Sequence, residues 1–410
     1  MTRHGGSQAT DFPLGAAITL DALEDPHAHL AALREREPVS WVPALGAWLV
    51  TRRDLALVVM RDPATFTVED ERFSTSRVVG ASMLSLDGAE HDRHRAPFAQ
   101  PFRLDAVRSR FTEPVGAEAG RLIAALRPAG RAELRTAFAG PLAAAVITRA
   151  LGLGNADVAA VLDWYAAIVG SVTALTAGEP AGAEGPAAFA GLRDAIGPAL
   201  DAGPEASLLA AAAGAAGTLT REEVVSNAAV LLFGGIETTE GMIATAAWHL
   251  LSHPDQRALV EADRGLLAGA VEESLRLEPA AASVDRYATR DVQLGGARIA
   301  RGDLVVVSVT AANRDPASFP NPDAFDVRRA NARLHLAFAA GPHVCIGMHL
   351  ARLEAQAALG CLLDGLPGLQ LDPDRRSPGS RGLVFRKPAA VSAVWHDGAH
   401  AARHDPTAAP

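Results

Sequence analysis

The stretch of sequence that decides the fold is Phe338-Ala-Ala-Gly-Pro-His-Val-Cys345-Ile-Gly347, followed by a run with helical spacing from Met348 to Leu363. One cysteine therefore lies in a glycine-flanked turn directly before a predicted helix. Free backbone N–H groups and the dipole at a helix N-terminus stabilise a thiolate. A lone cysteine is more often a small buried apolar residue. Here Gly341 and Gly347 let the backbone approach a flat, bulky group, which favours a metal-ligating thiolate over simple packing.

The composition sets broad limits on the class of protein. The chain has 410 residues, 49% of them hydrophobic, and a formal net charge of -9, which argues against a nucleic-acid binder. The polar segment 1–12 lacks the apolar core of a secretory signal, and no apolar stretch of about 18 residues runs without a charged residue or glycine. Cys345 and Cys361 would lie roughly 24 Å apart along a helix, too far for a disulfide. We therefore expect a cytoplasmic protein with reduced thiols and no membrane span.

The hydrophobic spacing predicts a mainly α fold with small β-sheets. Helices are expected at 53–62, 88–100, 104–126, 141–152, 156–176, 186–201, 221–251 and 254–277. The other expected features are a hairpin over 39–50, a long loop at 69–86, strands within 284–310, a helix-poor segment at 313–335 and a last pair of strands near 382–395. Because no repeat or long linker divides the chain, we expect one domain over 1–410 with flexible ends at 1–20 and 397–410.

The longest predicted helix, 221–251, carries Gly234-Gly235-Ile236-Glu237-Thr238-Thr239 in its middle. It is apolar on all sides, which indicates a helix running through the core. Each glycine inside a helix costs about 1 kcal/mol relative to alanine, so the pair alone indicates close helix packing. The Thr238 hydroxyl can reach back to the Gly234 carbonyl and open a small groove. An acid, Glu237, and an alcohol in one buried turn suit a site that holds a ligand and relays protons.

Taken together, these segments resemble the cytochrome P450 family. The cysteine turn is similar to the family pattern Phe-Gly-x-Gly-x-His-x-Cys-x-Gly, with Ala339 where the family usually has its first glycine. The 234–239 hexad resembles the family's distal-helix motif Ala/Gly-Gly-x-Asp/Glu-Thr-Thr. The resemblance runs from about Pro38 to the C-terminal strands. It implies a cytochrome P450-like fold with haem b between the long helix and the cysteine loop, and it implies Cys345 as the iron ligand.

The resemblance also implies which residues surround the cofactor. Haem carries two propionate carboxylates, and buried carboxylates require cations, of which arginine is the best match. The segment from Asp87 to Arg95 resembles a family segment that supplies such contacts, although a solvated charged helix face is an equally good reading of it. The implied cofactor-binding residues are His91, Arg95, Arg286, His335, Phe338, Gly341, His343 and Gly347. A zinc site at His343, Cys345 and His349 is the competing interpretation, but structural zinc normally takes paired cysteines.

A Glu-x-x-Arg pair, Glu273 and Arg276, lies between the two motifs at the family's spacing. Alone it reads as an ordinary i,i+3 surface ion pair worth a few tenths of a kcal/mol. In the family this pair is buried and binds an arginine of the following irregular segment. We expect Arg329 to be that third residue, with Arg328 as the alternative. The role of the set is structural.

The resemblance implies a haem-thiolate monooxygenase that inserts one oxygen atom from O2 into a C–H bond or an alkene. A thiolate ligand favours O–O cleavage, and Glu237 and Thr238 would deliver the protons. Oxidative coupling or another reaction without insertion is the alternative at the same site, and a non-catalytic all-α binding protein is the alternative of another class. No flavin or nicotinamide module fits outside the haem domain. Electrons are therefore expected from NAD(P)H through a separate ferredoxin reductase and ferredoxin, the latter docking on Arg103, Arg108, Arg110 and Arg352 of a monomer.

The substrate pocket is expected, by the same resemblance, along the long helix, the segment after the Glu-x-x-Arg helix and a C-terminal turn. Small side chains at 280–283 indicate room close to the iron. The expected substrate is a bulky apolar small molecule, an intermediate of natural-product biosynthesis. The expected lining residues are Gly234, Ala282, Ser283, Val284, Leu383 and Val384.

Overall fold

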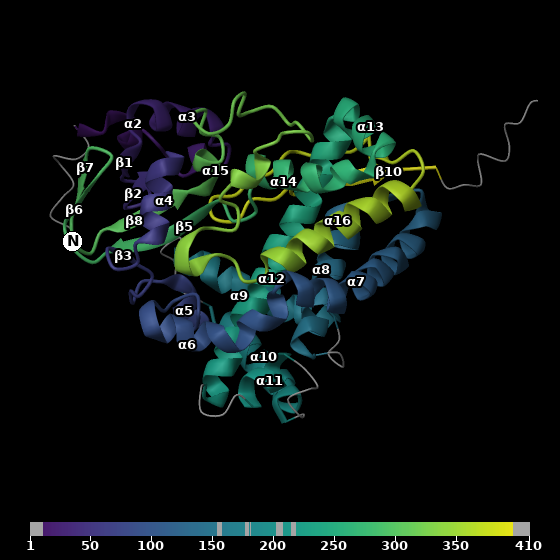
Figure 1. The fold of residues 1–410 in the computed structure, drawn as a ribbon, viewed down its shortest axis with the longest axis horizontal. Coiled ribbons are helices and arrows are strands. Elements are labelled where there is room, and N and C mark those ends of the chain that lie inside the picture. The colour runs from purple at the N-terminus through teal and green to yellow at the C-terminus, as the bar shows by residue number, and fades with distance from the viewer. Residues whose placement is uncertain are drawn as a thin grey trace, which may run out of the picture.

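A five-stranded sheet lies at one side of the computed structural model, and most of the long helices lie on the other side (Figure 1). The structure describes residues 11–153, 158–176, 180, 182–201, 208–214 and 219–396. The sheet has the order β1-β2-β8-β5-β3, formed by Val39–Val42, Ala47–Val50, Leu304–Ser308, Ser283–Ala288 and Phe66–Thr67. A three-stranded sheet has the order β4-β10-β9, formed by Arg131–Glu133, Ser392–Val394 and Gln370–Leu371. The strands β6 and β7 pair as Val292–Leu294 and Ala297–Ile299.

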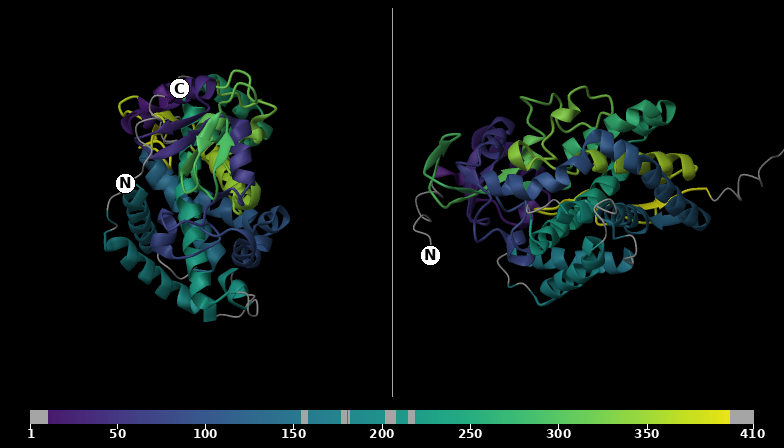
Figure 2. Two further views of the ribbon diagram at one scale, coloured as in Figure 1. Left: turned by 90° about the vertical axis from the view of Figure 1, so that its left-hand side faces the viewer. Right: turned by 60° about the horizontal axis from the view of Figure 1, so that its bottom comes forward.

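The helices occupy the chain between these strands, and Figure 2 shows the same arrangement in two further views. The α-helices are α2 Pro13–Ala16, α3 His27–Arg36, α4 Arg53–Arg61, α5 Ser74–Val79, α6 Gly88–Ala99, α7 Leu104–Leu126, α8 Gly140–Leu151, α9 Val158–Thr176, α10 Glu184–Asp201, α11 Leu208–Gly214, α12 Arg221–Ser252, α13 Pro254–Ala262, α14 Leu267–Leu277, α15 Val309–Ala312 and α16 Met348–Gly365. Shorter helical turns are η1 Asp21–Leu23, η2 Gln100–Phe102, η3 Arg127–Ala129, η4 Arg135–Ala139, η5 Arg264–Leu266, η6 Ala332–Leu334 and η7 Gly341–His343. The expected mainly α fold with small sheets is confirmed.

The predicted hairpin over 39–50 is present, and its register explains its stability. Trp41 lies opposite Trp48, and the two rings meet edge to face at 5.6 Å. Gly46 takes a positive φ of 59° in the connecting turn, a conformation that glycine adopts at little cost. The strand β2 then pairs in parallel with β8 through residues 48–50. Two separate apolar clusters cover the two faces of the sheet.

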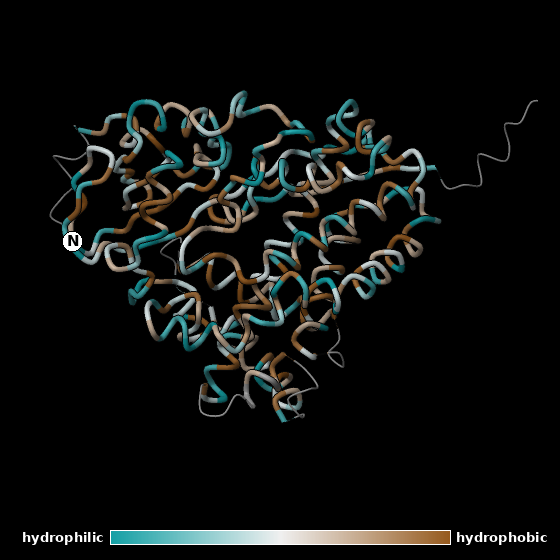
Figure 3. The backbone as a smooth tube through the Cα atoms, viewed as in Figure 1, coloured by the Kyte–Doolittle hydropathy of each residue, from teal (hydrophilic) through white to brown (hydrophobic). Residues whose placement is uncertain are grey.

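Helix α12 passes through the centre of the helical part (Figure 1). A capping box at its start, in which Thr220 and Glu223 bond each other's backbone N–H, fixes the first turn. Its neighbours are α8, α14 and α16. Most of its side chains are buried on all sides, as its apolar composition predicted. Apolar segments gather where these elements meet (Figure 3).

Several predicted boundaries differ from the structure. The helix expected over 254–277 is two helices, because the Asp263 side chain accepts the Gly265 N–H and starts a new turn. The loop expected at 69–86 contains α5, Ser74–Val79. The last pair of strands is reduced to β10, which pairs with β4 and β9 instead.

The prediction of flexible ends is wrong for part of the N-terminal segment. Residues 1–20 were expected to be flexible, yet α2 lies against β1, where Glu37 accepts the N–H groups of Leu14 and Gly15 and Ile18 is buried. The rest of the expected flexible ends, 1–10 and 397–410, lies outside the described residues. The single domain stays a prediction. Within the described residues one helical window, Val158–Leu175, could cross a membrane by length and composition alone, and such a window is weak evidence because core helices of soluble proteins share these properties.

Candidate haem-thiolate site

The cysteine loop is closed by its own backbone and opens directly into α16. The Cys345 N–H donates to the Phe338 carbonyl at 2.9 Å, and Gly347 caps the helix. The Cys345 side chain is exposed, yet many protein atoms surround its sulfur at longer range. The protein atoms around the sulfur desolvate the Cys345 thiol and so raise its pKa. The N–H groups of Gly347 and Met348 and the guanidinium groups of Arg95 and Arg352 act in the opposite direction. The helix terminus therefore points donors at the sulfur as predicted, but burial outweighs their effect on its pKa.

Two residues of the loop have left-handed backbone conformations, for different reasons. Gly341 has φ 74°, and a Cβ atom there would lie 2.3 Å from the Met60 carbonyl oxygen of α4. Glycine is required at this position by packing against α4, which is not the reason proposed from the sequence. Ala339, where the family pattern has glycine, has φ 58°. Its N–H donates to the Leu336 carbonyl at 2.8 Å, so the turn keeps its hydrogen bond at the cost of backbone strain.

Three predicted cofactor residues gather beside the loop. The rings of His91 and His343 lie 4.6 Å apart, and Arg95 donates to the Val344 carbonyl at 2.7 Å. His343 Nε2 lies 2.8 Å from Asp87 Oδ1. Burial alone raises the pKa of Asp87, but hydrogen bonds from His343, Thr67 and the Val68 N–H bring it to about 2. Asp87 therefore fixes the His343 ring as a carboxylate.

Two arginines near this group have no anionic partner among the described residues, and this is the observation that fits a haem. His91 is buried, and its Nε2 has no hydrogen-bond partner among the described residues. Arg286 is buried on β5 and donates to the Asp285 carbonyl at 2.7 Å. Within the described part of the chain, Arg95 and Arg286 form no ion pair. Burial lowers the pKa of both guanidinium groups. Two carboxylates placed here would supply the missing charge.

His335 lies in a different cluster, which corrects the expected propionate contact. Its Nε2 is 3.0 Å from Glu272 Oε2 on α14, and Arg352 donates to the same carboxylate at 2.6 Å. Burial alone raises the pKa of Glu272, but His335 and Arg352 bring it to about 2. Phe338 packs under this cluster, with the Arg352 guanidinium 4.4 Å from its ring centre. His335 thus links the segment before the cysteine loop to Glu272 of α14, and it does not face His91 or Arg95.

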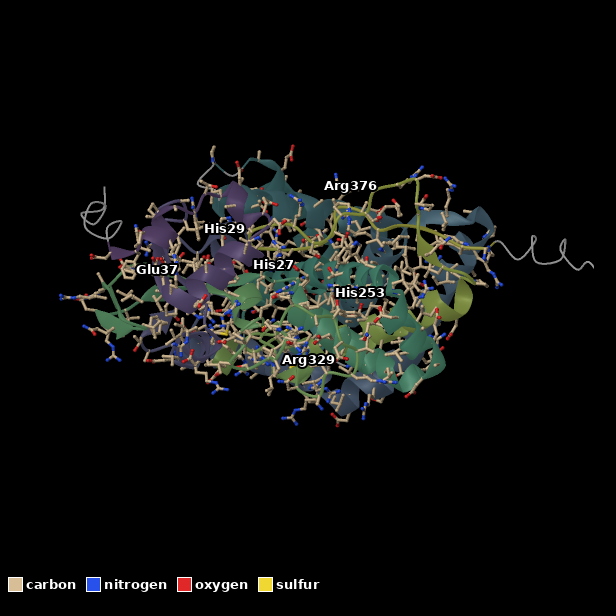
Figure 4. All side chains as sticks on the ribbon, turned by 90° about the horizontal axis from the view of Figure 1, so that it is seen from above. His27, His29, Glu37, His253, Arg329 and Arg376 are labelled. Atoms are coloured by element: carbon tan, nitrogen blue, oxygen red, sulfur yellow. The ribbon has the colours of Figure 1, made fainter. Side chains whose placement is uncertain are left out.

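The structure brings together the three residues of the expected Glu/Arg set. Arg276 and Arg329 donate to the Glu273 carboxylate at 2.7 and 2.8 Å, and the side chains of Glu273 and Arg276 are 0% exposed. Arg276 also donates to the carbonyls of Asn313, Pro322 and Ala324. Arg329 therefore makes the contact (it is labelled in Figure 4), whereas the exposed side chain of Arg328 does not.

The hexad of α12 divides into a packing part and an open part. A Cβ atom at Gly235 would lie 2.7 Å from Ile147 of α8, so this glycine serves close helix packing. A Cβ atom at Gly234 would have no such neighbour within 4 Å. The Thr238 hydroxyl donates to the Gly234 carbonyl at 2.6 Å, the back-bond expected from the sequence. The groove therefore opens at Gly234 and Thr238.

Glu237 belongs to a buried polar network that the sequence did not reveal. Lys387 Nζ lies 2.9 Å from Glu237 and 3.1 Å from Glu240, and Arg135 pairs with Glu240 at 2.8 Å. The Tyr165 hydroxyl also donates to Glu237. Burial raises the pKa of Glu237, and Lys387 opposes that effect. The sequence signal that could have revealed this network was Glu240, a second acid one helical turn after Glu237. Two buried acids need a cation from another part of the chain.

The predicted pocket residues do not line one cavity. Ala282, Ser283 and Leu383 line a pocket together with apolar residues of α3, β2 and β8. Val284 follows Ser283 on β5, so it points to the opposite face of the strand, the face that carries Arg286. Val384 contributes its carbonyl, which accepts the Ala282 N–H at 2.8 Å. Gly234 lies on α12 and is not part of this pocket lining.

The competing zinc interpretation has no ligand set in the part of the chain that the structure describes. No group of three or more His, Cys, Asp or Glu side chains there is arranged to hold a metal ion. His343 is instead bound to Asp87.

Comparisons with known proteins show which family, relatives and solved structures this chain resembles. The family model described as Cytochrome P450 matches residues 203–366. Cytochrome P450 monooxygenase PikC of Streptomyces venezuelae is 36% identical over 94% of this chain and 95% of its own length. The 20-oxo-5-O-mycaminosyltylactone 23-monooxygenase of Streptomyces fradiae is 34% identical over 90% of this chain and 88% of its own. The crystal structure of P450BioI with an acyl carrier protein superimposes with a TM-score of 0.82 at 28% identity, covering 92% of this chain and 99% of that one.

Proposed function

Since this chain belongs to the cytochrome P450 family and is a monooxygenase of that family, we propose that Cys345 ligates the iron of haem b and that Glu237 and Thr238 deliver protons for oxygen insertion. The observation that carries this proposal is the position of the Cys345 sulfur close to Arg95, a guanidinium that forms no ion pair among the described residues. A thiolate-ligated haem supplies the chemistry that activates dioxygen.

The residues that would hold the haem come from four segments. Cys345 would bind the iron, and His91, Arg95, His343 and Arg286 would face the propionates. The proposal draws support from the unpartnered His91 Nε2 and from the two arginines without ion pairs among the described residues. Asp87 orients His343 through Nε2, so the opposite side of that ring is the side left for the cofactor. His335 is not proposed as a contact, because Glu272 binds it.

The proposed proton route uses α12. The Thr238 hydroxyl is held by the Gly234 carbonyl at the open part of the helix, and Glu237 is one residue away within the buried network. Burial raises the pKa of Glu237 above its ordinary value, so this carboxyl binds a proton more readily than an exposed glutamate does. The apolar side chains of α12 exclude bulk water from this route.

We propose a bulky apolar small molecule from natural-product biosynthesis as the substrate. Support comes from the small side chains at 280–283 and from a relative whose name gives 20-oxo-5-O-mycaminosyltylactone as its substrate. A binding-shift screen of such metabolites against the haem-loaded protein is the direct route to the substrate, because a ligand near the iron changes the visible spectrum.

Electrons are proposed to come from NAD(P)H through a ferredoxin reductase and a ferredoxin. Arg103, Arg108 and Arg110 are exposed near the start of α7, which packs against α16, and they fit an acidic partner. Arg352 is committed to Glu272 and contributes less than the sequence suggested. A cytoplasmic monomer is part of the same proposal.

The thiolate assignment is tested by spectroscopy. The reduced protein with carbon monoxide is expected to show the strongly red-shifted Soret band of thiolate ligation. The Cys345→Ser variant is expected to lose that band completely, because serine is a poor iron ligand. Cys361→Ser is the matched control and should keep it, since Cys361 lies on α16 more than four helical turns away. A Cys345→Ser protein with an unchanged band would reject the assignment.

The proton route is tested by the coupling of electron use to product. With the best compound from the screen and a surrogate ferredoxin and reductase, Thr238→Ala is expected to raise peroxide release per NAD(P)H several-fold. The reason is that the hydroxyl nearest the open groove is lost. Thr239→Ala is the control, a buried threonine on the same turn. Equal coupling in the wild type and Thr238→Ala would count against the route.

A further inference from the structure

The chain contains a single lysine, Lys387, among its 38 lysine and arginine residues. Every other permanent side-chain cation is an arginine. The ammonium of this lysine lies in the interior network, 2.9 Å from Glu237, 3.1 Å from Glu240 and 3.4 Å from the Tyr165 hydroxyl. An ammonium is a compact charge with three donors that can point in different directions, whereas the planar arginine fork suits one carboxylate at a time. The geometry around Lys387 calls for a lysine.

The two carboxylates of this network depend on Lys387 to different degrees. Glu240 also pairs with Arg135 at 2.8 Å. Among the described residues, Glu237 has Lys387 as its only ion-pair partner. The Glu237 side chain is 5% exposed and that of Lys387 is 23% exposed. Removing Lys387 therefore leaves Glu237 without a counter-ion and leaves Glu240 with one.

Lys387 is attached to the turn that lines the apolar pocket. The preceding residue, Arg386, is buried and donates to Glu278 and to the carbonyls of Ser380 and Gly382. The backbone groups of Arg381 and Lys387 bond each other and close the turn. Between them lie Leu383, which lines the pocket, and Phe385, whose ring meets Phe233 of α12 at 5.3 Å. A displacement of this turn would move the Lys387 ammonium.

We propose that Lys387 is a positioning residue that holds Glu237 in the network and ties it to the turn 381–387, which packs on α12 through Phe385. The inference rests on the proposed function, in which Glu237 supplies protons. Lys387 does not touch the reacting atoms. It decides where the Glu237 carboxylate points.

The first experiment needs no turnover and uses the haem-loaded protein. Melting temperatures are measured from pH 5.5 to pH 8.5 for the wild type, Lys387→Met, Glu237→Gln and the double variant. Without its cation, Glu237 ionises less readily in the folded protein than in the unfolded chain, so stability falls as pH rises. The melting temperature of Lys387→Met is therefore expected to fall further below wild type at pH 8.5 than at pH 5.5. In the Glu237→Gln background most of this extra loss should disappear.

A control variant and a chemical labelling experiment keep the test decisive. Arg135→Met breaks the ion pair with Glu240 and leaves the contact between Lys387 and Glu237 in place, so its loss of melting temperature should be similar in the wild-type and Glu237→Gln backgrounds. If Lys387→Met does not fold, the single lysine itself is the probe. Its reductive methylation, followed by mass spectrometry, is expected to be slow in the wild type and several-fold faster in Glu237→Gln. Equal methylation rates, or a pH-dependent loss that is the same in both backgrounds, would overturn the proposal.

The second experiment separates positioning from a purely structural role. Under the conditions of the Thr238 experiment, Lys387→Met is expected to raise peroxide release several-fold with little change in KM, and Lys387→Arg to restore part of the coupling. Wild-type coupling in Lys387→Met would also overturn the proposal. Failure of the proposed function has a different signature, namely the absence of the red-shifted carbon monoxide band in the wild type.

Discussion

Glu273→Gln is expected to lower the free energy of unfolding by about 3–5 kcal/mol. The substitution removes the negative charge between two guanidinium groups, those of Arg276 and Arg329, at 2.7 and 2.8 Å. Arg276 is fully buried, so its charge would remain in the interior without an anion. Carbonyl oxygens of the segment 313–324 would still accept its hydrogen bonds but carry no net charge. Urea unfolding followed by far-UV circular dichroism measures the effect.

The chain offers a matched control for this experiment. Glu118 and Arg121 have the same i,i+3 spacing on α7, with side-chain exposures of 24% and 64%. Exposed pairs of this kind contribute about 0–1 kcal/mol, so Glu118→Gln should change stability by a few tenths. Similar losses in Glu118→Gln and Glu273→Gln would show that burial does not set the value of the pair.

Glu354→Gln is expected to stabilise the protein at alkaline pH, by about 1–3 kcal/mol near pH 8. Glu354 lies on α16, is 3% exposed, and its Oε2 has no hydrogen-bond partner among the described residues. Burial raises the pKa of this carboxyl well above its ordinary value. The folded protein therefore keeps a proton that the unfolded chain releases, and stability falls as pH rises between the unfolded and folded pKa values. Glutamine removes this dependence.

The measurement is the difference in unfolding free energy between variant and wild type from pH 5 to pH 8. The advantage of Glu354→Gln should grow across this range. Glu133→Gln is a control of opposite sign. Burial alone raises the pKa of Glu133, but hydrogen bonds from Thr136 and from the N–H groups of Val391 and Arg135 lower it below its ordinary value. Its charge therefore stabilises the folded state above the unfolded pKa, and the variant should lose stability there. A flat difference for Glu354→Gln would refute its buried protonated state.

The fold was predictable wherever local pattern and tertiary packing agree. Helix α12 and the hairpin of β1 and β2 are examples, because an apolar composition on all sides favours a core helix and two short strand-like runs joined by a turn favour a hairpin. The break at Asp263 was not predicted, since one capping side chain interrupts an otherwise helical pattern. Strands β4 and β9 were also missed. They have three and two residues, too few for a period to show.

The site was predictable at its motifs and not in its long-range contacts. The positions of Cys345, Thr238 and the Glu273 pair are local properties of turns and helices. The choice of Glu272 by His335 depends on how α14 meets the cysteine loop, 63 residues away in sequence. Lys387 is separated from Glu237 by 150 positions in the chain, so only the folded structure shows that they meet. The alternation of Ser283 and Val284 was readable from sequence, yet both had been assigned to one pocket.

The left-handed Ala339 makes the cysteine loop dependent on a distant helix. An alanine in this conformation is disfavoured by about 1 kcal/mol or more, so the isolated segment adopts it roughly five-fold less often than a glycine would. The loop is therefore poorly organised by itself and takes its shape from tertiary contacts. The tightest of these is Gly341 against the Met60 carbonyl of α4. Small shifts of α4, which shares no residue with the cysteine loop, would thus be transmitted to the Cys345 sulfur, and α4 becomes a remote place from which the ligand geometry can be tuned.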